Sequence, residues 1–123
     1  FVDLGSGCGG LLNNLAKVHK NGLFYGIESA PLPLLISKLR SLPNHGSCQI
    51  FWGSFWEYDL SQYDVVYAYL SPIPMESLWR KVSKEMRPGS LLISNTFLIP
   101  GVTPHKSIQL NDFSNSTLYL WKI

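Results

Sequence analysis

The chain has 123 residues, of which 46% are hydrophobic and 15% charged, a composition that is typical of an ordered domain and excludes a disordered chain. Ten Lys and Arg against eight Asp and Glu leave a net charge of +2, which gives no strong signal for nucleic-acid binding. The two cysteines, Cys8 and Cys48, fit neither a disulfide framework nor a metal-ligand spacing. We therefore expect one domain over residues 1–123, without a metal, in the cytoplasm or another reducing compartment.

The start of the sequence carries no recognisable targeting signal. No apolar stretch approaches the roughly twenty residues of a membrane span, and there is no signal peptide. The chain begins at Phe1, directly on an apolar run and without an initiator methionine. We expect that an N-terminal segment is missing from this sequence, and that any membrane association would come from that segment.

The first ten residues predict a buried strand that turns tightly into a helix. Residues 1–4 form a short apolar run that contains Asp3, and glycines at positions 5, 7 and 9 follow it. Without a Cβ, these glycines allow a sharp bend and let a ligand lie against the main chain. Apolar residues then recur at helical spacing over residues 11–18, and Asn21-Gly22 is expected to stop the helix. The helix N-terminus suits an anionic group such as a carboxylate.

The acid before the glycines makes the pattern more specific. Asp3-Leu4-Gly5-Ser6-Gly7-Cys8-Gly9 resembles the D-x-G-x-G-x-G motif of class I S-adenosylmethionine-dependent methyltransferases. The resemblance implies that Asp3 orients the loop and the methionine end of the cofactor. It also implies cofactor contacts from Gly5, Ser6, Gly7, Cys8 and Gly9. The alternative is an NAD-type Rossmann domain, whose G-x-G-x-x-G pattern fits only if Gly10 is used.

A second strand is predicted over residues 23–28, with Glu28 at its carboxyl end. In a doubly wound sheet, an acid at this position can accept both hydroxyls of a ribose. Gly26-Ile27-Glu28 also resembles the G-x-D/E pattern of the methyltransferases. We therefore assign Glu28 to the ribose, while a role in favouring the dipole of the following helix stays open and is compatible with it.

The next helix is expected over residues 31–41, with a buried stripe of Leu32, Leu35, Ile36 and Leu39. Residues 42–46 read as a loop in which His45 is expected to face solvent. A third strand follows at residues 48–52. In many class I methyltransferases the next segment carries an acidic residue that contacts the adenine amino group. This sequence has Ser54 at that position. Ser54 is a candidate for a hydrogen bond to an adenine nitrogen. Phe55 or Trp56 is a candidate to pack on the adenine ring, and ordinary core packing is the alternative for both aromatic residues.

The fourth strand, residues 63–70, opens with Y-D-V-V, which resembles the F-D-x-V entry to this strand in the family. Ser71-Pro72-Ile73-Pro74 follows, where methyltransferases acting on base or glutamine amino groups carry N/D-P-P-Y/F. The three departures from that motif lower the case for methylation of DNA or RNA bases. Tyr69 and Ser71 are candidates for substrate contact, with a packed strand and a helix cap as alternatives.

The rest of the chain completes a Rossmann-like α/β sheet. A surface helix buries Met75, Leu78, Trp79, Val82 and Met86, and R-P-G-S precedes a fifth strand at residues 91–95. Residues 106–110 and 116–123 predict a hairpin. The expected fold is therefore a class I methyltransferase sheet, mostly parallel with a C-terminal antiparallel hairpin and with helices on both faces. His105, in the loop before the hairpin, is a weak candidate for a catalytic base.

Within the family, the short chain, its F-V-D-L-G-S-G-C-G-G opening and its T-P-H loop are similar to small protein-lysine methyltransferases related to the ATP-synthase c-subunit enzyme. The resemblance implies S-adenosylmethionine-dependent methyl transfer to an acceptor that the sequence does not identify, with a protein lysine as the candidate. The alternative is a non-catalytic module that keeps the fold for cofactor or partner binding, with which Ser54 and the absent N-P-P-Y motif are compatible.

Overall fold

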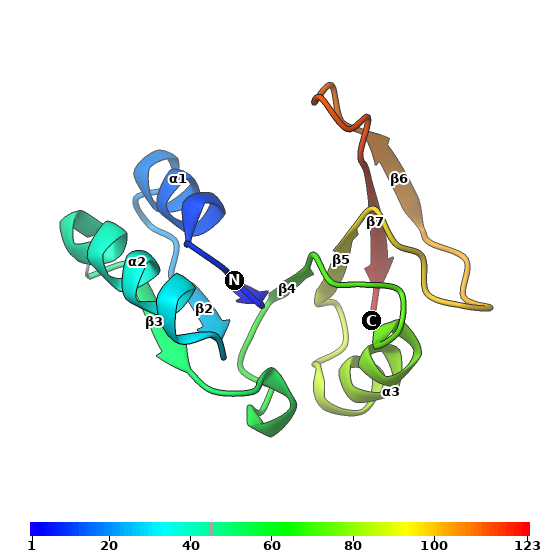
Figure 1. The fold of residues 1–123 in the computed structure, drawn as a ribbon. Coiled ribbons are helices and arrows are strands. Elements are labelled where there is room, and N and C mark those ends of the chain that lie inside the picture. The colour runs from blue at the N-terminus through cyan, green and yellow to red at the C-terminus, as the bar shows by residue number, and fades with distance from the viewer. Residues whose placement is uncertain (45) are drawn as a thin grey trace. The chain divides into compact units, whose positions relative to one another are not determined.

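The structure is a computed structural model that describes residues 1–44 and 46–123, so the expected solvent position of His45 lies outside the described residues. The chain divides into two compact units, Phe1–Tyr58 and Asp59–Ile123. Each unit combines a sheet with helices packed on it (Figure 1). None of the helices in the described ranges has the length and apolar character needed to span a bilayer.

The first unit alternates strands and helices. Its parallel strands β1 (Val2–Leu4), β2 (Phe24–Glu28) and β3 (Cys48–Trp52) lie in the order β3-β2-β1. Helices α1 (Gly10–Val18) and α2 (Pro31–Ser41) make the crossovers, and the short helices η1 (Leu42–Asn44) and η2 (Phe55–Glu57) flank β3. Because the strands are parallel, their carboxyl ends meet at one edge, which is where α/β sheets bind ligands.

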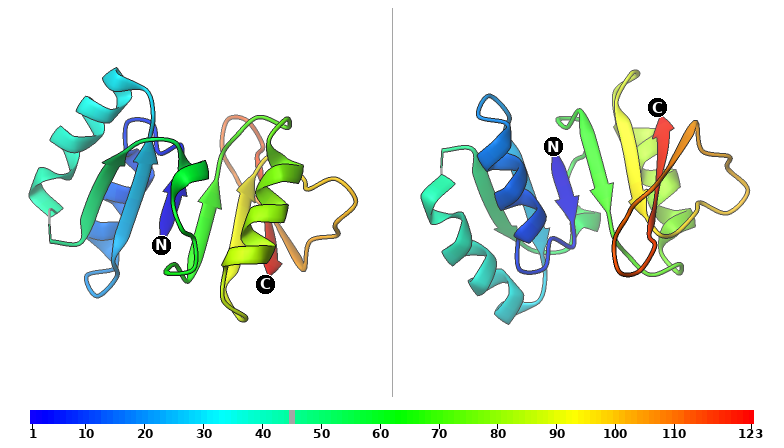
Figure 2. Two further views of the ribbon diagram at one scale, coloured as in Figure 1. Left: turned by 90° about the horizontal axis from the view of Figure 1, so that it is seen from below. Right: turned by 90° about the horizontal axis from the view of Figure 1, so that it is seen from above.

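The core of the first unit lies between its helices and one face of its sheet. It contains Leu12, Ala16, Phe24, Cys48 and Ile50, all buried. A Cβ at position 26 would come 2.7 Å from Leu12 and 2.9 Å from Ile50, so glycine there lets α1 approach β2 closely. The two views of Figure 2 show α1 and α2 beside the strands of the first unit, β1, β2 and β3.

Helix α2 differs from the expectation. The predicted buried stripe is wrong, because Leu32, Leu35 and Leu39 are 67%, 56% and 59% exposed. Ser37 and Ser41 face the interior instead and are buried. The physical reason is the close approach of α2 to the glycine loop, which leaves room only for small side chains. The end of α1 also differs: the helix ends at Val18, and Asn21-Gly22 lies in the turn beyond it.

The second unit begins with parallel strands β4 (Val65–Ala68) and β5 (Leu91–Asn95), joined by α3 (Met75–Glu85). β7 (Thr117–Lys122) pairs antiparallel with β5 and with β6 (Lys106–Gln109). Helix α3 buries Met75, Leu78 and Val82, as its apolar spacing predicts. The predicted fold class, with parallel strands and a C-terminal antiparallel hairpin, is confirmed.

Candidate cofactor site

The loop between β1 and α1 bends through left-handed backbone conformations. Gly5, Gly7 and Gly9 have φ values of 77°, 53° and 73°, which residues with a side chain rarely adopt. The amides of Gly5 and Ser6 both donate to the carbonyl of Ile27, at 2.9 and 3.1 Å. The loop is therefore held over the carboxyl end of β2, at the edge where ligands bind.

Glu28 fastens this loop to the start of α2. Its Oε2 accepts a hydrogen bond from the Gly7 amide at 2.7 Å, and its Oε1 accepts one from the Ala30 amide at 2.8 Å. The side chain is buried. Each carboxylate oxygen has a second lone pair, so Glu28 can still accept two hydrogen bonds from a diol such as a ribose. The free acceptor positions of Glu28 therefore fit the ribose hydroxyls of the expected cofactor.

Asp3, the middle residue of β1, adds a second buried carboxyl one residue before the end of the strand. It is 5% exposed and lies in register with Gly26 of β2. Burial, and to a lesser extent the charge of Glu28, raise the pKa of Asp3 to about 7. A strongly shifted carboxyl in this position is typical of a functional site, and a cationic ligand group would relieve the like-charge contact.

The glycines of the loop have different surroundings. A Cβ at Gly7 would meet no atom within 4 Å, so this position is open to a ligand. A Cβ at Gly9 would collide with Ser37 Oγ, so this glycine serves the packing of the loop on α2. Ser6 Oγ is buried and lies against Gly26. A ligand contact from Ser6 would therefore come from its main chain.

The end of β3 completes the edge in the first unit. The Gly53 amide donates to the Glu28 carbonyl at 3.1 Å, which joins the ends of β2 and β3. Ser54 follows, half-buried, and its hydroxyl makes no capping hydrogen bond to η2. The rings of Phe55 and Trp56 lie 4.5 Å apart. Ser54 and Phe55 thus follow β3 at the sheet edge where Glu28 ends β2 and where Asp3 precedes the last residue of β1. Cys8 is half-buried, and its carbonyl accepts a bond from the Arg40 guanidinium at 3.4 Å.

The three weak catalytic candidates lie in the second unit. Tyr69 is 57% exposed and Ser71 is exposed, both in the segment after β4. Ser71 does not cap α3, whose N-cap residue is Pro74. His105 Nδ1 accepts a hydrogen bond from the Lys122 amide at 3.2 Å, across the β6-β7 pair. Its ring therefore has a local structural partner.

The structure also shows a polar group that the sequence analysis missed. Asn95, at the end of β5, donates from Nδ2 to the Tyr67 hydroxyl at 3.0 Å, and Thr96 Oγ1 donates to Asn95 Oδ1 at 2.9 Å. Thr96 has a φ of 74°, a strained conformation for a β-branched residue. The group lies where β5 ends, at a ligand-binding position for this fold. The only sign of this polar group in the sequence was the presence of polar residues at the end of an apolar strand.

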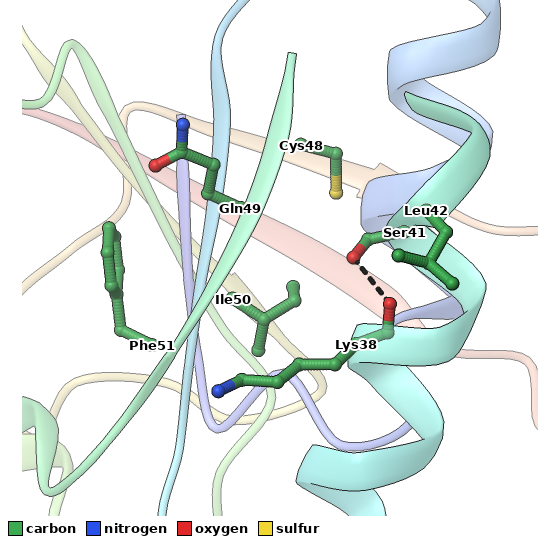
Figure 3. Close-up of a pocket in the computed structure, with 7 residues that line it drawn as sticks. All are labelled: Lys38, Ser41, Leu42, Cys48, Gln49, Ile50 and Phe51. Carbon is green, nitrogen blue, oxygen red and sulfur yellow. Dashed lines mark hydrogen bonds between the residues drawn. The ribbon is translucent and has the colours of Figure 1, made fainter. Parts of the chain in front are cut away.

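A cavity of about 390 Å³ lies elsewhere in the first unit. It is lined by residues of α2, η1 and β3, namely Lys38, Ser41, Leu42, Cys48, Gln49, Ile50 and Phe51 (Figure 3). It contains none of the predicted cofactor residues and is a separate feature. Across residues 1–44 and 46–123, no group of three His, Cys, Asp or Glu side chains is placed to hold a metal ion.

Comparison with known proteins gives concordant matches. The ANTKMT methyltransferase domain family matches residues 3–106. A curated protein-lysine N-methyltransferase from Saccharolobus islandicus (strain REY15A) is 31% identical over 124 residues, covering 98% of this chain and 77% of the relative.

Solved structures match along the whole chain. An RNA methyltransferase from Salinibacter ruber, in complex with S-adenosylhomocysteine, is 26% identical with a TM-score of 0.89, over 99% of this chain and 78% of that one. The B. subtilis tRNA methyltransferase TrmK is 12% identical with a TM-score of 0.80, over 98% of this chain and 58% of that one, and it supports the fold alone.

Proposed function

Since the chain belongs to the ANTKMT methyltransferase domain family and is an S-adenosylmethionine-dependent methyltransferase, we propose that its acceptor is the side-chain amine of a protein lysine. The observation that carries this proposal is the 31% identity, over 98% of the chain, to a protein-lysine N-methyltransferase. Membership of an enzyme family argues against the alternatives of a non-catalytic module and an NAD-binding domain.

The first unit holds the cofactor in this proposal. Glu28 accepts the ribose hydroxyls with its remaining lone pairs, and Asp3 lies near the methionine end. The open main chain at Gly7 lies against the ligand, and Ser54 and Phe55 contact the adenine. When bound, the cofactor supplies an electrophilic methyl group. The contribution of these residues is then orientation, which is worth up to about 7–11 kcal/mol of a barrier in favourable cases.

The candidate side chains for contact with the acceptor belong to the second unit. A lysine amine has an ordinary pKa of about 10.4 and must lose its proton before it can act as a nucleophile. The exposed hydroxyls of Tyr69 and Ser71 can orient the amine and accept hydrogen bonds from it. His105 is the weaker candidate, because its Nδ1 already accepts the Lys122 amide.

RNA is the second candidate acceptor, because the Salinibacter ruber relative is an RNA methyltransferase at 26% identity. The charges of α3 favour lysine over RNA. Arg80 lies 3.7 Å from Glu76, and Lys81 lies 2.8 Å from Glu85, so acids neutralise much of the basic surface of this helix. A polyanion gains most from unpaired Lys and Arg side chains.

Two measurements test the proposal. Calorimetric titration with S-adenosylmethionine, S-adenosylhomocysteine and NAD should show binding of the first two only. Glu28→Ala should abolish that binding, and Glu57→Ala, which removes an exposed acid from the same unit, should leave it unchanged. Methyl transfer from tritiated cofactor is then measured to lysine-containing peptides, to the same peptides with lysine replaced by arginine, and to RNA. Label in RNA but in neither peptide would overturn the lysine assignment while leaving the methyltransferase assignment intact.

A further inference from the structure

Helix α2 and the first residue of η1 present a continuous apolar surface to solvent. We call it the leucine face, and it consists of Leu32, Leu35, Leu39 and Leu42, which are 67%, 56%, 59% and 63% exposed. Their spacing of three, four and three residues places them along one side of the helix. Single exposed leucines are ordinary on protein surfaces, whereas a continuous row of four is a feature of interaction sites.

The exposure of the leucine face is built into the sequence of α2. The opposite side of the helix carries Ser37 and Ser41, which are buried, and the half-buried Leu34 packs on the core. Two small polar residues of α2 therefore face the protein, while three of its leucines, Leu32, Leu35 and Leu39, face outward. A helix whose only task was to cover the sheet would have the reverse pattern.

Positive charges border the leucine face. Lys38 and Arg40 precede and follow Leu39, so helical geometry places them on its two sides. No carboxylate in the described part of the chain forms a salt bridge with either of them. Residues 29–56 contain no Asp or Glu at all. The border of the leucine face is therefore cationic, which complements an anionic partner.

The cavity beside α2 continues this surface. Leu42 of the leucine face and Lys38 at its border also line the cavity of about 390 Å³, together with the apolar side chains of Cys48 and Ile50. Figure 3 shows the Lys38 side chain extending from α2 toward β3. An ammonium group above apolar walls suits a ligand with an anionic head and an apolar tail.

We propose that the leucine face docks this domain onto an anionic lipid surface. Helices that lie in a membrane interface combine an aliphatic face with Lys or Arg at its border. Protein interfaces rely instead on Trp, Tyr and Arg, with leucine under-represented among their strongest contacts. Trp52 fits the same assignment: it is 68% exposed, and its indole donates to the carbonyl of Ser29, just before α2. Exposed tryptophans are enriched at membrane interfaces.

The test is flotation of the 123-residue chain with vesicles of phosphatidylcholine, alone or mixed with phosphatidylserine. Wild type should float with the mixed vesicles, and high salt should reduce the bound fraction. Leu35→Gln with Leu39→Gln should weaken binding at least about tenfold, because glutamine keeps helix propensity and removes the apolar surface. Circular dichroism of the double variant checks that it is folded.

The matched control is Phe113→Gln, which removes the most exposed aromatic ring in the second unit and should leave vesicle binding unchanged. The proposal is overturned if folded wild type does not float with phosphatidylserine vesicles, or if the leucine variant floats as well as wild type. It is also overturned if sedimentation shows a wild-type dimer that the leucine substitutions dissociate, because the occupant would then be a second copy of the chain.

Discussion

Replacing Asp3 by Asn tests the assignment of the buried carboxyl of β1. Burial beside Glu28 raises the pKa of Asp3 to about 7 from an ordinary 3.8. Between these two pH values, the folded protein holds a proton that the unfolded chain has lost. The free energy of unfolding therefore falls as the pH rises from about 4 to about 7.

The size of the effect follows from the two pKa values. The difference between about 7 and 3.8, at about 1.4 kcal/mol per pKa unit, gives a destabilisation of roughly 4 kcal/mol above pH 7. An asparagine cannot ionise, so Asp3→Asn removes this contribution. Its amide still needs hydrogen-bond partners, which lowers the gain by about 1–2 kcal/mol. We expect the variant to be more stable than wild type by about 2–3 kcal/mol at neutral pH.

Urea unfolding of both proteins at several pH values between about 4 and about 8 measures this difference. At the acidic end the variant should be less stable than wild type by about 1–2 kcal/mol, the cost of its buried amide, and it should become the more stable protein as the pH rises. Above pH 7, where Asp3 of wild type is ionised, the same variant should bind S-adenosylmethionine at least about tenfold more weakly, because the site loses a negative charge. A stability difference that stays constant with pH would refute the reasoning, since it would show that Asp3 ionises in the folded protein as it does in the unfolded chain.

Three further predictions concern single contacts. Glu28→Gln should lower stability by about 1–3 kcal/mol in thermal unfolding, because the amide nitrogen cannot accept from the backbone amide that it faces; full stability would argue against the two observed hydrogen bonds. Gly9→Ala should lower the melting temperature through its collision with Ser37 and its φ of 73°, whereas Gly10→Ala, in open space at the start of α1, should preserve or raise it. Glu85→Ala should cost about 1–3 kcal/mol in urea unfolding, because the Leu60 amide loses its partner, while Glu76→Ala on the same helix should cost under about 0.5 kcal/mol; equal losses would contradict this distinction.

The sequence was sufficient for the strands, the crossovers and the loop at residues 5–9, because these depend on local signals. Apolar runs, the glycines of a tight turn and an acid near the end of a strand can all be recognised in the sequence itself. The burial of α2 was not predictable in this way. Its leucines have the spacing of a core stripe, and only the approach of Ser37 to Gly9, far apart in sequence, shows that the helix is turned the other way.

The residues of the candidate site show the same difference between local sequence signals and contacts made only in the fold. Asp3, the loop glycines and Glu28 belong to one contiguous motif and its neighbouring strand, so their proximity could be inferred from the topology. The contact between Asn95 and Tyr67 joins two strands through side chains whose types carry no recognisable motif. The roles of Tyr69, Ser71 and His105, and the existence of one domain over residues 1–123, stay predictions.

The double hydrogen bonding of Glu28 has a kinetic consequence. Because the protein's own carboxylate fixes the Gly7 and Ala30 amides, the shape of the glycine loop does not depend on contacts from a ligand. The loop is preorganised, and association loses little additional backbone entropy. We therefore expect encounter rather than loop closure to limit the association rate, and differences in affinity among related ligands to arise from their dissociation rates.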